Sequence, residues 1–196
     1  MIVPRACRRT AALQLERILP LHGSPSNPEK FCPWCGAPLV DRQVEGRTRR
    51  ACSSCPHVVY AHPTVGAVAA VVKQGSVLLV RRRVEPFRGH WTLPAGYLEL
   101  DEEPWETARR ETREETGLEI EHVELLGVLT NRDDLRRQGV VVAYLARPVG
   151  GELRAGDDAE DARFFELGRL PEALGFANNH RLLQDLVRRG LAGRLP

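Results

Sequence analysis

The segment GYLELDEEPWETARRETREETGL, residues 96–118, combines the signals of a helix with a crowding of acidic side chains. Proline is favoured in the first turn of a helix and glycine just after the last, so a helix is expected from about Pro104 to Gly117. Residues three and four positions apart share one face of a helix. Three glutamates therefore project from one face and repel one another: Glu111, Glu114 and Glu115.

Two explanations account for this acidic face. Glu and Arg both favour helices, and a helix that faces solvent often carries alternating charges without forming a site. The other explanation is a divalent cation, because Mg²⁺ and Mn²⁺ prefer carboxylate oxygens and leave coordination positions free for substrate phosphates. Glu102 lies just ahead of the helix, near enough to reach this face. Arg110 can orient a carboxylate through two hydrogen bonds.

The wider spacing distinguishes the two explanations. The segment resembles the Nudix box of the Nudix hydrolase family, G-x5-E-x7-R-E-U-x-E-E-x-G-U, in which U is an aliphatic residue. One position departs from this pattern, because Thr112 stands at the first U and leaves the charged set intact. The other defined positions agree: Gly96, Glu102, Arg110, Glu111, Glu114, Glu115, Gly117 and Leu118.

The resemblance covers about residues 63–190 and implies both a fold and a chemistry. Nudix proteins share an α/β/α sandwich with a mixed sheet. They hydrolyse a nucleoside diphosphate linked to another group, in many cases releasing a nucleoside monophosphate. The resemblance therefore implies a metal-dependent attack of water on phosphorus.

Roles in this chemistry carry over by position. The resemblance implies that Arg110 and Glu102 organise the metal ligands, and family members often add a carboxylate from beyond the box. Asp161, with Glu160 behind it, is the candidate for that carboxylate, and the identity of the general base is left open. The implied ligands of Mg²⁺ or Mn²⁺ are Glu111, Glu114 and Glu115.

The surrounding sequence fits a mixed α/β fold. VGAVAAVVK and SVLLVR, residues 65–73 and 76–81, are apolar runs separated by Gln74-Gly75, which predicts a two-strand hairpin. WTLPAGYLE, residues 91–99, is expected to be a loop because a proline and a glycine bound it. The remaining expected elements are strands at 119–130 and 139–148, a short strand within 162–170 and a closing helix at 179–190.

Upstream lies FCPWCGAPLVDRQVEGRTRRACSSCPHVVY, residues 31–60, in which two C-x2-C pairs flank a polar segment. This segment can fold as a hairpin about Gly46. Two such pairs sixteen residues apart predict a tetrahedral zinc site with every position filled, and therefore a structural Zn²⁺. Two local disulfides or four free thiols are the alternatives. The expected ligands are Cys32, Cys35, Cys52 and Cys55.

A zinc ribbon ahead of a Nudix domain resembles a recognisable subgroup of the family. Its members include pyrophosphatases of NADH, FAD and ADP-ribose whose ribbons open with FCPxCGxPL, compared with FCPWCGAPL here. The S-Q-P-W-P-F-P-x-S signature of NADH pyrophosphatases is absent, so NADH is not favoured. Within the subgroup the ribbon often helps dimer formation, which leaves a homodimer open.

Side chains around the box are candidates for substrate binding. Four arginines border the loop before the box and can reach a diphosphate, although exposed arginines near a hairpin end are often only solvated. Three aromatic residues can stack on a base or a flavin, although aromatic side chains usually pack in cores. The arginines are Arg81, Arg82, Arg83 and Arg88, and the aromatic residues are Phe87, Trp91 and Tyr97. Gly96, which opens the box, joins the substrate-binding candidates.

Composition bounds the wider setting. At 196 residues with 42% hydrophobic content, the chain can bury a core, and its net charge of +2 is too small to argue for nucleic acid. No apolar stretch suits a membrane span or a secretory signal, so no membrane partner is expected and a cytoplasmic location is the default. Three segments are expected: an N-terminal extension with a weak helical pattern at 1–30, the zinc ribbon at 31–62 and the Nudix domain at 63–196.

The expected function is metal-dependent hydrolysis of a small nucleotide such as FAD, ADP-ribose or an NAD(H)-like dinucleotide. One alternative is removal of a nucleotide-derived cap from the 5′ end of RNA, with phosphate contacts from Arg47, Arg49 and Arg50 of the ribbon. Another is a non-catalytic Nudix-like module that senses a nucleotide or binds a protein. The complete set of box glutamates favours the enzyme.

Overall fold

The computed structural model describes residues 30–133 and 138–191. The chain divides into two compact units, one ending at Ala61 and the other beginning at His62. The weak helical pattern expected near the N-terminus lies outside the described residues. Within the described ranges, no helix is long and apolar enough to cross a membrane.

The first unit contains a small antiparallel sheet in the order β1-β2-β3. β1 (Leu39–Val44) and β2 (Arg47–Cys52) form a hairpin, and β3 (Val58–Val59) pairs with β2. Both residues of the hairpin turn, Glu45 and Gly46, have positive φ, at 52° and 74°. Glycine adopts this conformation at little cost, so Gly46 permits a two-residue turn. The hairpin predicted about this glycine is confirmed.

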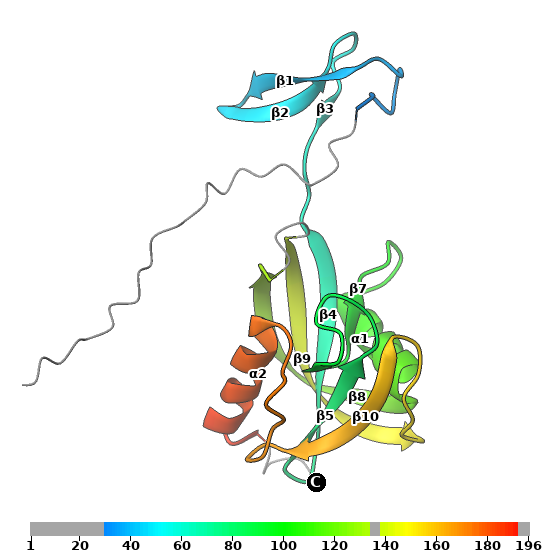
Figure 1. Cartoon of the computed structure of the whole chain (residues 1–196), viewed down its shortest axis with the longest axis vertical. Coiled ribbons are helices and arrows are strands. Elements are labelled where there is room, and N and C mark those ends of the chain that lie inside the picture. The colour runs from blue at the N-terminus through cyan, green and yellow to red at the C-terminus, as the bar shows by residue number, and fades with distance from the viewer. Residues whose placement is uncertain (1–29, 134–137, 192–196) are drawn as a thin grey trace, which may run out of the picture. The chain divides into compact units, whose positions relative to one another are not determined.

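The second unit is built on a mixed sheet in the order β10-β5-β4-β9-β8 (Figure 1). β4 lies at its centre, parallel to β9 and antiparallel to β5, while β8 and β10 pair antiparallel with β9 and β5. The strands predicted downstream of the box are thus confirmed. The bounds are β4 (Thr64–Lys73), β5 (Ser76–Arg82), β8 (Leu118–Asn131), β9 (Gly139–Gly151) and β10 (Ala159–Glu166).

β4 and β5 pair with each other only near their shared turn, where Lys73 lies opposite Ser76, which confirms the predicted hairpin. Farther along, each strand pairs with a short strand from the segment before the box. β6 (Trp91–Thr92) pairs with β5, and β7 (Ala95–Tyr97) pairs with β4. The prediction of a loop over residues 91–99 is therefore wrong for these two strands. β6 and β7 form because they hydrogen-bond to the free edges of β5 and β4. The local sequence of residues 91–99 does not show that these edges lie nearby.

α1 (Pro104–Thr116) has the ends that the sequence predicted. Pro104 is its first residue, and Gly117 ends it with a left-handed φ of 72°. Glu103 and Glu106 form a reciprocal capping box, in which the Glu103 N–H donates to Glu106 Oε2 at 3.0 Å. These signals are local in the chain, which is why the sequence located both ends of the helix.

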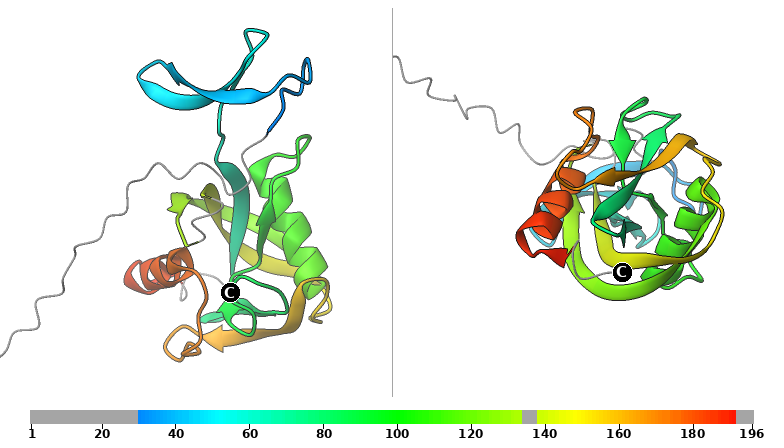
Figure 2. Two further views of the ribbon diagram at one scale, coloured as in Figure 1. Left: turned by 45° about the horizontal axis from the view of Figure 1, so that its top comes forward. Right: turned by 90° about the horizontal axis from the view of Figure 1, so that it is seen from below.

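Two helices cover opposite faces of the sheet (Figure 2). Successive residues of a strand point to opposite faces, so the apolar run of β4 serves two cores. Val68 belongs to the core that contains Leu183 of α2 (Ala177–Arg188), whereas Ala69 belongs to the core that contains Ala108 of α1. The fold is the α/β/α sandwich with a mixed sheet that the sequence predicted, and α2 is the predicted closing helix.

Candidate active site

The charged residues of the box gather around Arg110. Its guanidinium makes a two-point contact with Glu102, from Nε to Oε1 at 2.6 Å and from Nη2 to Oε2 at 2.9 Å. Nη1 donates to Glu111 Oε1 at 2.7 Å and to Glu114 Oε2 at 3.0 Å. One cation therefore contacts three carboxylates, an arrangement that suits the organising role expected of Arg110.

Glu102 reaches back to the helix from the loop before it. Its Oε2 also accepts a hydrogen bond from Thr107 Oγ1 at 2.7 Å. The hydrogen bonds from Arg110 and Thr107 stabilise the ionised carboxylate and lower the pKa of Glu102 to about 2. Glu102 therefore stays negative at neutral pH and fixes the orientation of the guanidinium.

Glu115 is a buried carboxylate, with only 4% of the residue exposed. Its Oε2 accepts the backbone N–H of Ala95 in β7 at 3.2 Å. Burial, together with the charge of Glu111, raises the pKa of Glu115 to about 8. A solvated helix face does not explain a carboxylate in this position. A cation bound beside it would stabilise the charged form.

Gly96 leaves the space that the Glu111 side chain occupies. A Cβ built on Gly96 would overlap the Glu111 carboxylate, so a larger residue would displace that side chain. Burial also raises the pKa of Glu111, and the contact with Arg110 opposes that rise. The first glycine of the box is thus required by the close approach of β7 to α1.

Two aspartates outside the predicted set have charges that act on the box glutamates. The charge of Asp157 acts on Glu111 and that of Asp158 acts on Glu115, and each contributes to raising the pKa of its glutamate. Their loop is tied to the end of α1, because the Gly156 N–H donates to the Glu115 carbonyl at 3.0 Å. The sequence shows an acidic run after β9. Only the folded structure shows that Asp157 and Asp158, the first two residues of this run, act on the box glutamates.

Asp161 and Glu160, the carboxylates predicted to join the box, contact arginines of the sheet. Asp161 Oδ2 lies 2.6 Å from Arg163 Nη2, and Glu160 Oε1 lies 2.9 Å from Arg81 Nε. Both residues belong to β10, beyond the loop that carries Asp157 and Asp158. To join the box glutamates as predicted, Asp161 would have to break its ion pair with Arg163.

The other substrate-binding candidates differ in their contacts. Arg83 and Arg88 are both exposed, and Arg83 Nη2 donates to the Ala159 carbonyl at 3.0 Å, which places it against the acidic loop. Tyr97 is 53% exposed, and its carbonyl accepts Arg110 Nη2 at 3.2 Å. Arg83 and Tyr97 are therefore adjacent to elements of the acidic cluster.

Of the aromatic candidates, Trp91 packs in the core. Its ring centroid lies 4.7 Å from that of Phe165 in an edge-to-face arrangement, and it packs against the core beneath α2. Phe87 instead stays partly exposed, with its ring centroid 4.6 Å from that of Phe176. Phe176 was not selected from the sequence, because nothing local links it to the loop of Phe87.

The four cysteines of the first unit form one cluster. Their Sγ atoms all lie within 4.8 Å of one another, and three of the pairs are 3.4 to 3.7 Å apart. Tetrahedral Zn–S bonds of about 2.3 Å place sulfurs about 3.8 Å apart, so the cluster fits Zn²⁺. The Ser54 and Cys55 N–H groups donate to Cys52 Sγ at 3.3 Å, and these bonds lower the pKa of that thiol to about 6.

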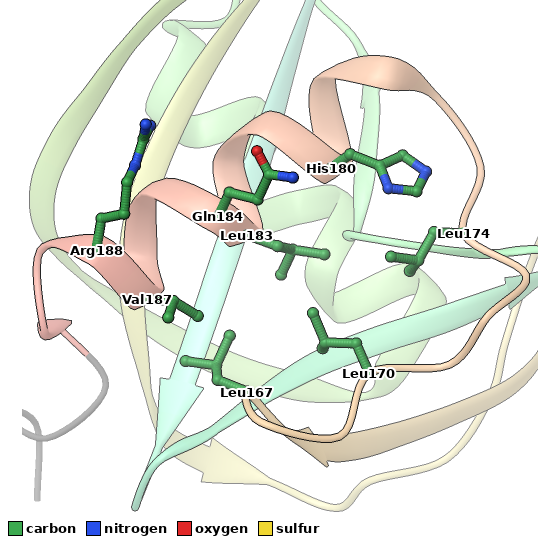
Figure 3. Close-up of a pocket in the computed structure, with 8 residues that line it drawn as sticks. All are labelled: Leu167, Leu170, Leu174, His180, Leu183, Gln184, Val187 and Arg188. Atoms are coloured by element: carbon green, nitrogen blue, oxygen red, sulfur yellow. The ribbon is translucent and has the colours of Figure 1, made fainter. Parts of the chain in front are cut away.

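A hollow with a volume of about 410 Å³ lies elsewhere, between α2 and the segment after β10 (Figure 3). Leucines and a valine form its floor, with polar side chains of α2 at its rim. No carboxylate lines it, so it does not suit a hard divalent cation, and none of the predicted site residues lines it. The residues are Leu167, Leu170, Leu174, His180, Leu183, Gln184, Val187 and Arg188.

Comparison with known proteins assigns both units to families. Residues 61–186 match the NUDIX domain. The chain belongs to the NUDIX family. Residues 30–61 match the zinc-ribbon family described as Nudix N-terminal, so the resemblance indicated by the box and the cysteines is confirmed.

This Nudix chain is similar to relatives with different named activities. It is 38% identical over 131 residues to the ADP-ribose pyrophosphatase of Methanocaldococcus jannaschii, covering 66% of this chain and 76% of that protein. It is 28% identical over 158 residues to the NAD-capped RNA hydrolase NudC of Chromobacterium violaceum. That match covers 79% of this chain but spans only 57% of NudC.

Solved structures agree with the Nudix fold. A NUDIX hydrolase from Nitrosomonas europaea superposes with a TM-score of 0.76 at 29% identity, covering 86% of this chain and 95% of that one. The NUDIX domain of Shewanella oneidensis NrtR, solved in complex with ADP ribose, superposes with a TM-score of 0.58 at 26% identity. That match covers 66% of this chain and 90% of the NrtR domain.

Proposed function

We propose that this Nudix hydrolase is a divalent-metal-dependent pyrophosphatase. Its substrate is a nucleoside diphosphate linked to another group, of the ADP-ribose, FAD or NAD(H)-like class, and one product is a nucleoside monophosphate. The observation that carries the proposal is the set of carboxylates gathered on α1 around one arginine, with Glu115 buried among them.

The chemistry of these side chains fits a hard divalent cation. Glu111 and Glu115 are both poorly exposed, and burial raises the pKa of each. The charge of Glu111 adds to the rise at Glu115, and the charge of Glu114 adds to the rise at Glu111. Carboxylate oxygens at this density suit Mg²⁺ or Mn²⁺, which also keep positions for water and for substrate phosphates. Glu111, Glu114 and Glu115 are the proposed ligands. Asp157 and Asp158, whose charges reach the same glutamates, are proposed as the carboxylates from beyond the box.

The protein orients the carboxylates and accepts a proton in the proposed reaction, and the bound metal ion adds a third contribution. Arg110 holds Glu102, Glu111 and Glu114 in fixed orientations, and the Ala95 N–H holds Glu115. A bound Mg²⁺ or Mn²⁺ supplies neutralisation of the diphosphate and a water of lowered pKa. A carboxylate of the cluster accepts the proton of the water that attacks phosphorus, while the P–O bond to the departing phosphate monoester breaks.

ADP-ribose is the proposed first substrate to test. The relative that shares 38% identity is an ADP-ribose pyrophosphatase, and the similar NrtR domain was solved with ADP ribose bound. Arg83, beside the acidic loop, is a proposed contact to the diphosphate, and Tyr97, beside Gly96, is a further proposed substrate contact. Arg81 and Arg88 stay candidates for the diphosphate.

A hydrolysis panel tests this proposal. The wild type is incubated with Mg²⁺ or Mn²⁺ and FAD, NADH, NAD, ADP-ribose or diadenosine polyphosphates, and the products are identified by mass. The variant Glu114→Gln with Glu115→Gln provides the blank, because both substitutions keep side-chain volume. One preferred substrate that yields AMP is the expected result. If the wild type turns over no substrate faster than the double variant does, the proposal that the protein is a pyrophosphatase is wrong.

In the first unit, we propose that Zn²⁺ fills the four-cysteine cluster and has a structural role. All four ligands come from cysteine, so a tetrahedral ion would keep no position for substrate. A homodimer and a cytoplasmic location are also proposed for the protein. Light scattering after size exclusion measures the mass of the assembly, and imaging of a tagged chain measures its location.

A second candidate function is removal of a nucleotide cap from RNA. The match to NudC, a NAD-capped RNA hydrolase, includes most of this chain. The ribbon carries Arg47, Arg49 and Arg50 on β2, where Arg49 lies over the Tyr60 ring at 4.5 Å. Replacing Arg49 and Arg50 by alanine should weaken activity on capped RNA more strongly as salt is lowered, while hydrolysis of a free dinucleotide is unchanged. Equal losses on both substrates would exclude direct RNA contact.

A further inference from the structure

Two phenylalanines from distant parts of the chain meet with unusual backbone conformations. Phe87 has a φ of 64° and Phe176 a φ of 57°, and both are partly exposed. Their ring centroids are 4.6 Å apart, with the ring planes inclined at 59°. A bulky residue with positive φ is rare, and such conformations cluster where a binding site fixes a side chain.

Backbone contacts hold both phenylalanines in place. The Gly175 N–H donates to the Trp91 carbonyl at 2.9 Å, which anchors the residue before Phe176 to β6. A Cβ on Gly175 would lie 3.1 Å from Phe87 Cβ, so the two segments pass in close contact. On the other side, the Gly89 N–H donates to the Arg82 carbonyl at 2.8 Å. The ring pair is therefore supported from beneath by the ends of β5 and β6.

Arg82 links this ring pair to the acidic cluster. Its guanidinium carbon lies 5.4 Å from the centroid of the Phe176 ring, and its Nε donates to the Pro86 carbonyl at 2.7 Å. Arg82 is also the strand partner of Ala159, the residue that follows Asp158. A planar cation thus adjoins both the aromatic rings and the loop that reaches the box glutamates.

We infer that Phe87 and Phe176 bind the planar heterocycle of the substrate and set its specificity for ring-bearing nucleotides. The inference rests on the proposed function, whose substrate carries such a ring at one end of a diphosphate. The phenylalanine rings would contact the base, Arg82 would contact the phosphates, and the carboxylates would hold the metal that binds those phosphates. Stacking on an aromatic face tolerates different bases, so the pair selects for a ring rather than for one base.

Equilibrium binding separates ring recognition from hydrolysis. Isothermal titration with Mg²⁺ present compares AMP, GMP and FMN with ribose 5-phosphate, which lacks the ring. In Phe87→Leu and Phe176→Leu, which keep apolar volume but remove the π face, the Kd for the three ring ligands should rise about tenfold or more. The Kd for ribose 5-phosphate should not change. Phe87→Tyr and Phe176→Tyr should restore ring binding.

Kinetics and stability provide the controls. For the preferred dinucleotide, the leucine variants should raise KM about tenfold and keep kcat, because stacking binds substrate and transition state alike. Leu125→Ala on β8, where Leu125 is 52% exposed, should change neither quantity. Unfolding temperatures of all variants identify any that fail to fold, and the tyrosine variants then carry the test.

The outcomes distinguish this inference from the proposed function. If the wild type hydrolyses a dinucleotide but the leucine variants bind ring ligands normally, the inference is wrong and the function stands. If ring binding depends on the phenylalanines but no dinucleotide is hydrolysed, the proposed function fails and the ring site stands. Absence of ring-ligand binding by the wild type, or equal loss of ribose 5-phosphate binding, also overturns the inference.

Discussion

The cysteine cluster of the first unit and the glutamate cluster of the second differ in how their ligands are held. The four sulfurs lie within 4.8 Å of one another on short turns of a single small sheet. In the glutamate cluster, Arg110 contacts Glu102, Glu111 and Glu114 with one guanidinium, and Glu114 keeps 40% of its side chain exposed. The first arrangement is closed around its centre, whereas the second is open on one side.

The two clusters therefore suit different tasks. A tetrahedral ion with four protein ligands has no position for a substrate, so its contribution is to folding. A carboxylate cluster that a second group orients can accept an ion and still offer positions to water and phosphate. The contrast predicts that ligand loss in the first cluster affects folding, and that ligand loss in the second affects catalysis.

The largest expected effect follows from Cys52→Ser. Structural zinc contributes about 10 kcal/mol or more to the folding of small zinc domains. Zinc content should therefore fall from one ion per chain to background, and residues 30–61 should become sensitive to protease. The measurements are metal analysis and limited proteolysis, with Cys7→Ser as control. Retained zinc and protease resistance would show that the cluster does not need all four sulfurs.

The next effect belongs to Glu115→Gln. The glutamine still accepts the Ala95 N–H but carries no charge, so the fold should persist. The value of kcat should fall about a thousandfold, equivalent to about 4 kcal/mol. Steady-state kinetics and thermal unfolding measure the two quantities, and Glu119→Gln on β8 is the matched control. A fall below about tenfold would exclude Glu115 as a ligand that the reaction requires.

Arg110→Lys tests the organisation of the glutamates. Lysine keeps the charge but cannot contact Glu102, Glu111 and Glu114 with one planar group. The Mg²⁺ concentration needed for half-maximal activity should rise about 10- to 100-fold, the usual effect of losing a group that orients metal ligands. Activity titrations with Mg²⁺ measure it, with Arg109→Lys as control. An unchanged Mg²⁺ requirement would show that Arg110 does not orient the metal ligands.

The smallest effect compares two aspartates. Asp158→Asn removes a charge that acts on Glu115, whereas Asp161→Asn removes one that is paired with Arg163. The first should lower kcat/KM about tenfold, and the second by less than about twofold. Kinetics on the preferred substrate decide between them. The reverse order would restore Asp161, the residue predicted from the sequence, as the carboxylate from beyond the box.

Some features were predictable because their signals are local in the chain. The ends of α1 depend on Pro104 and Gly117, and the β4–β5 hairpin depends on the turn at Gln74-Gly75. Helical spacing alone brought the box glutamates together on one face. The spacing of the cysteines likewise indicated four sulfurs around one point.

Other features depend on contacts between distant segments. β6 and β7 exist because β5 and β4 offer them partners, and β7 in turn supplies the Ala95 N–H to Glu115. The clash that a side chain at Gly96 would cause arises only because β7 lies against α1.

From the sequence alone follow the family, the helix with its acidic face and the composition of the cysteine and glutamate clusters, because these depend on residue types at fixed separations. Only the fold shows which glutamate is buried, which aspartates have charges that act on the box glutamates, and which aromatic rings meet. Asp158 and Phe176 lie far along the chain from the groups that they adjoin. A local sequence pattern cannot predict that these residues lie close together. They meet only when the sheet brings its strand ends and loops together.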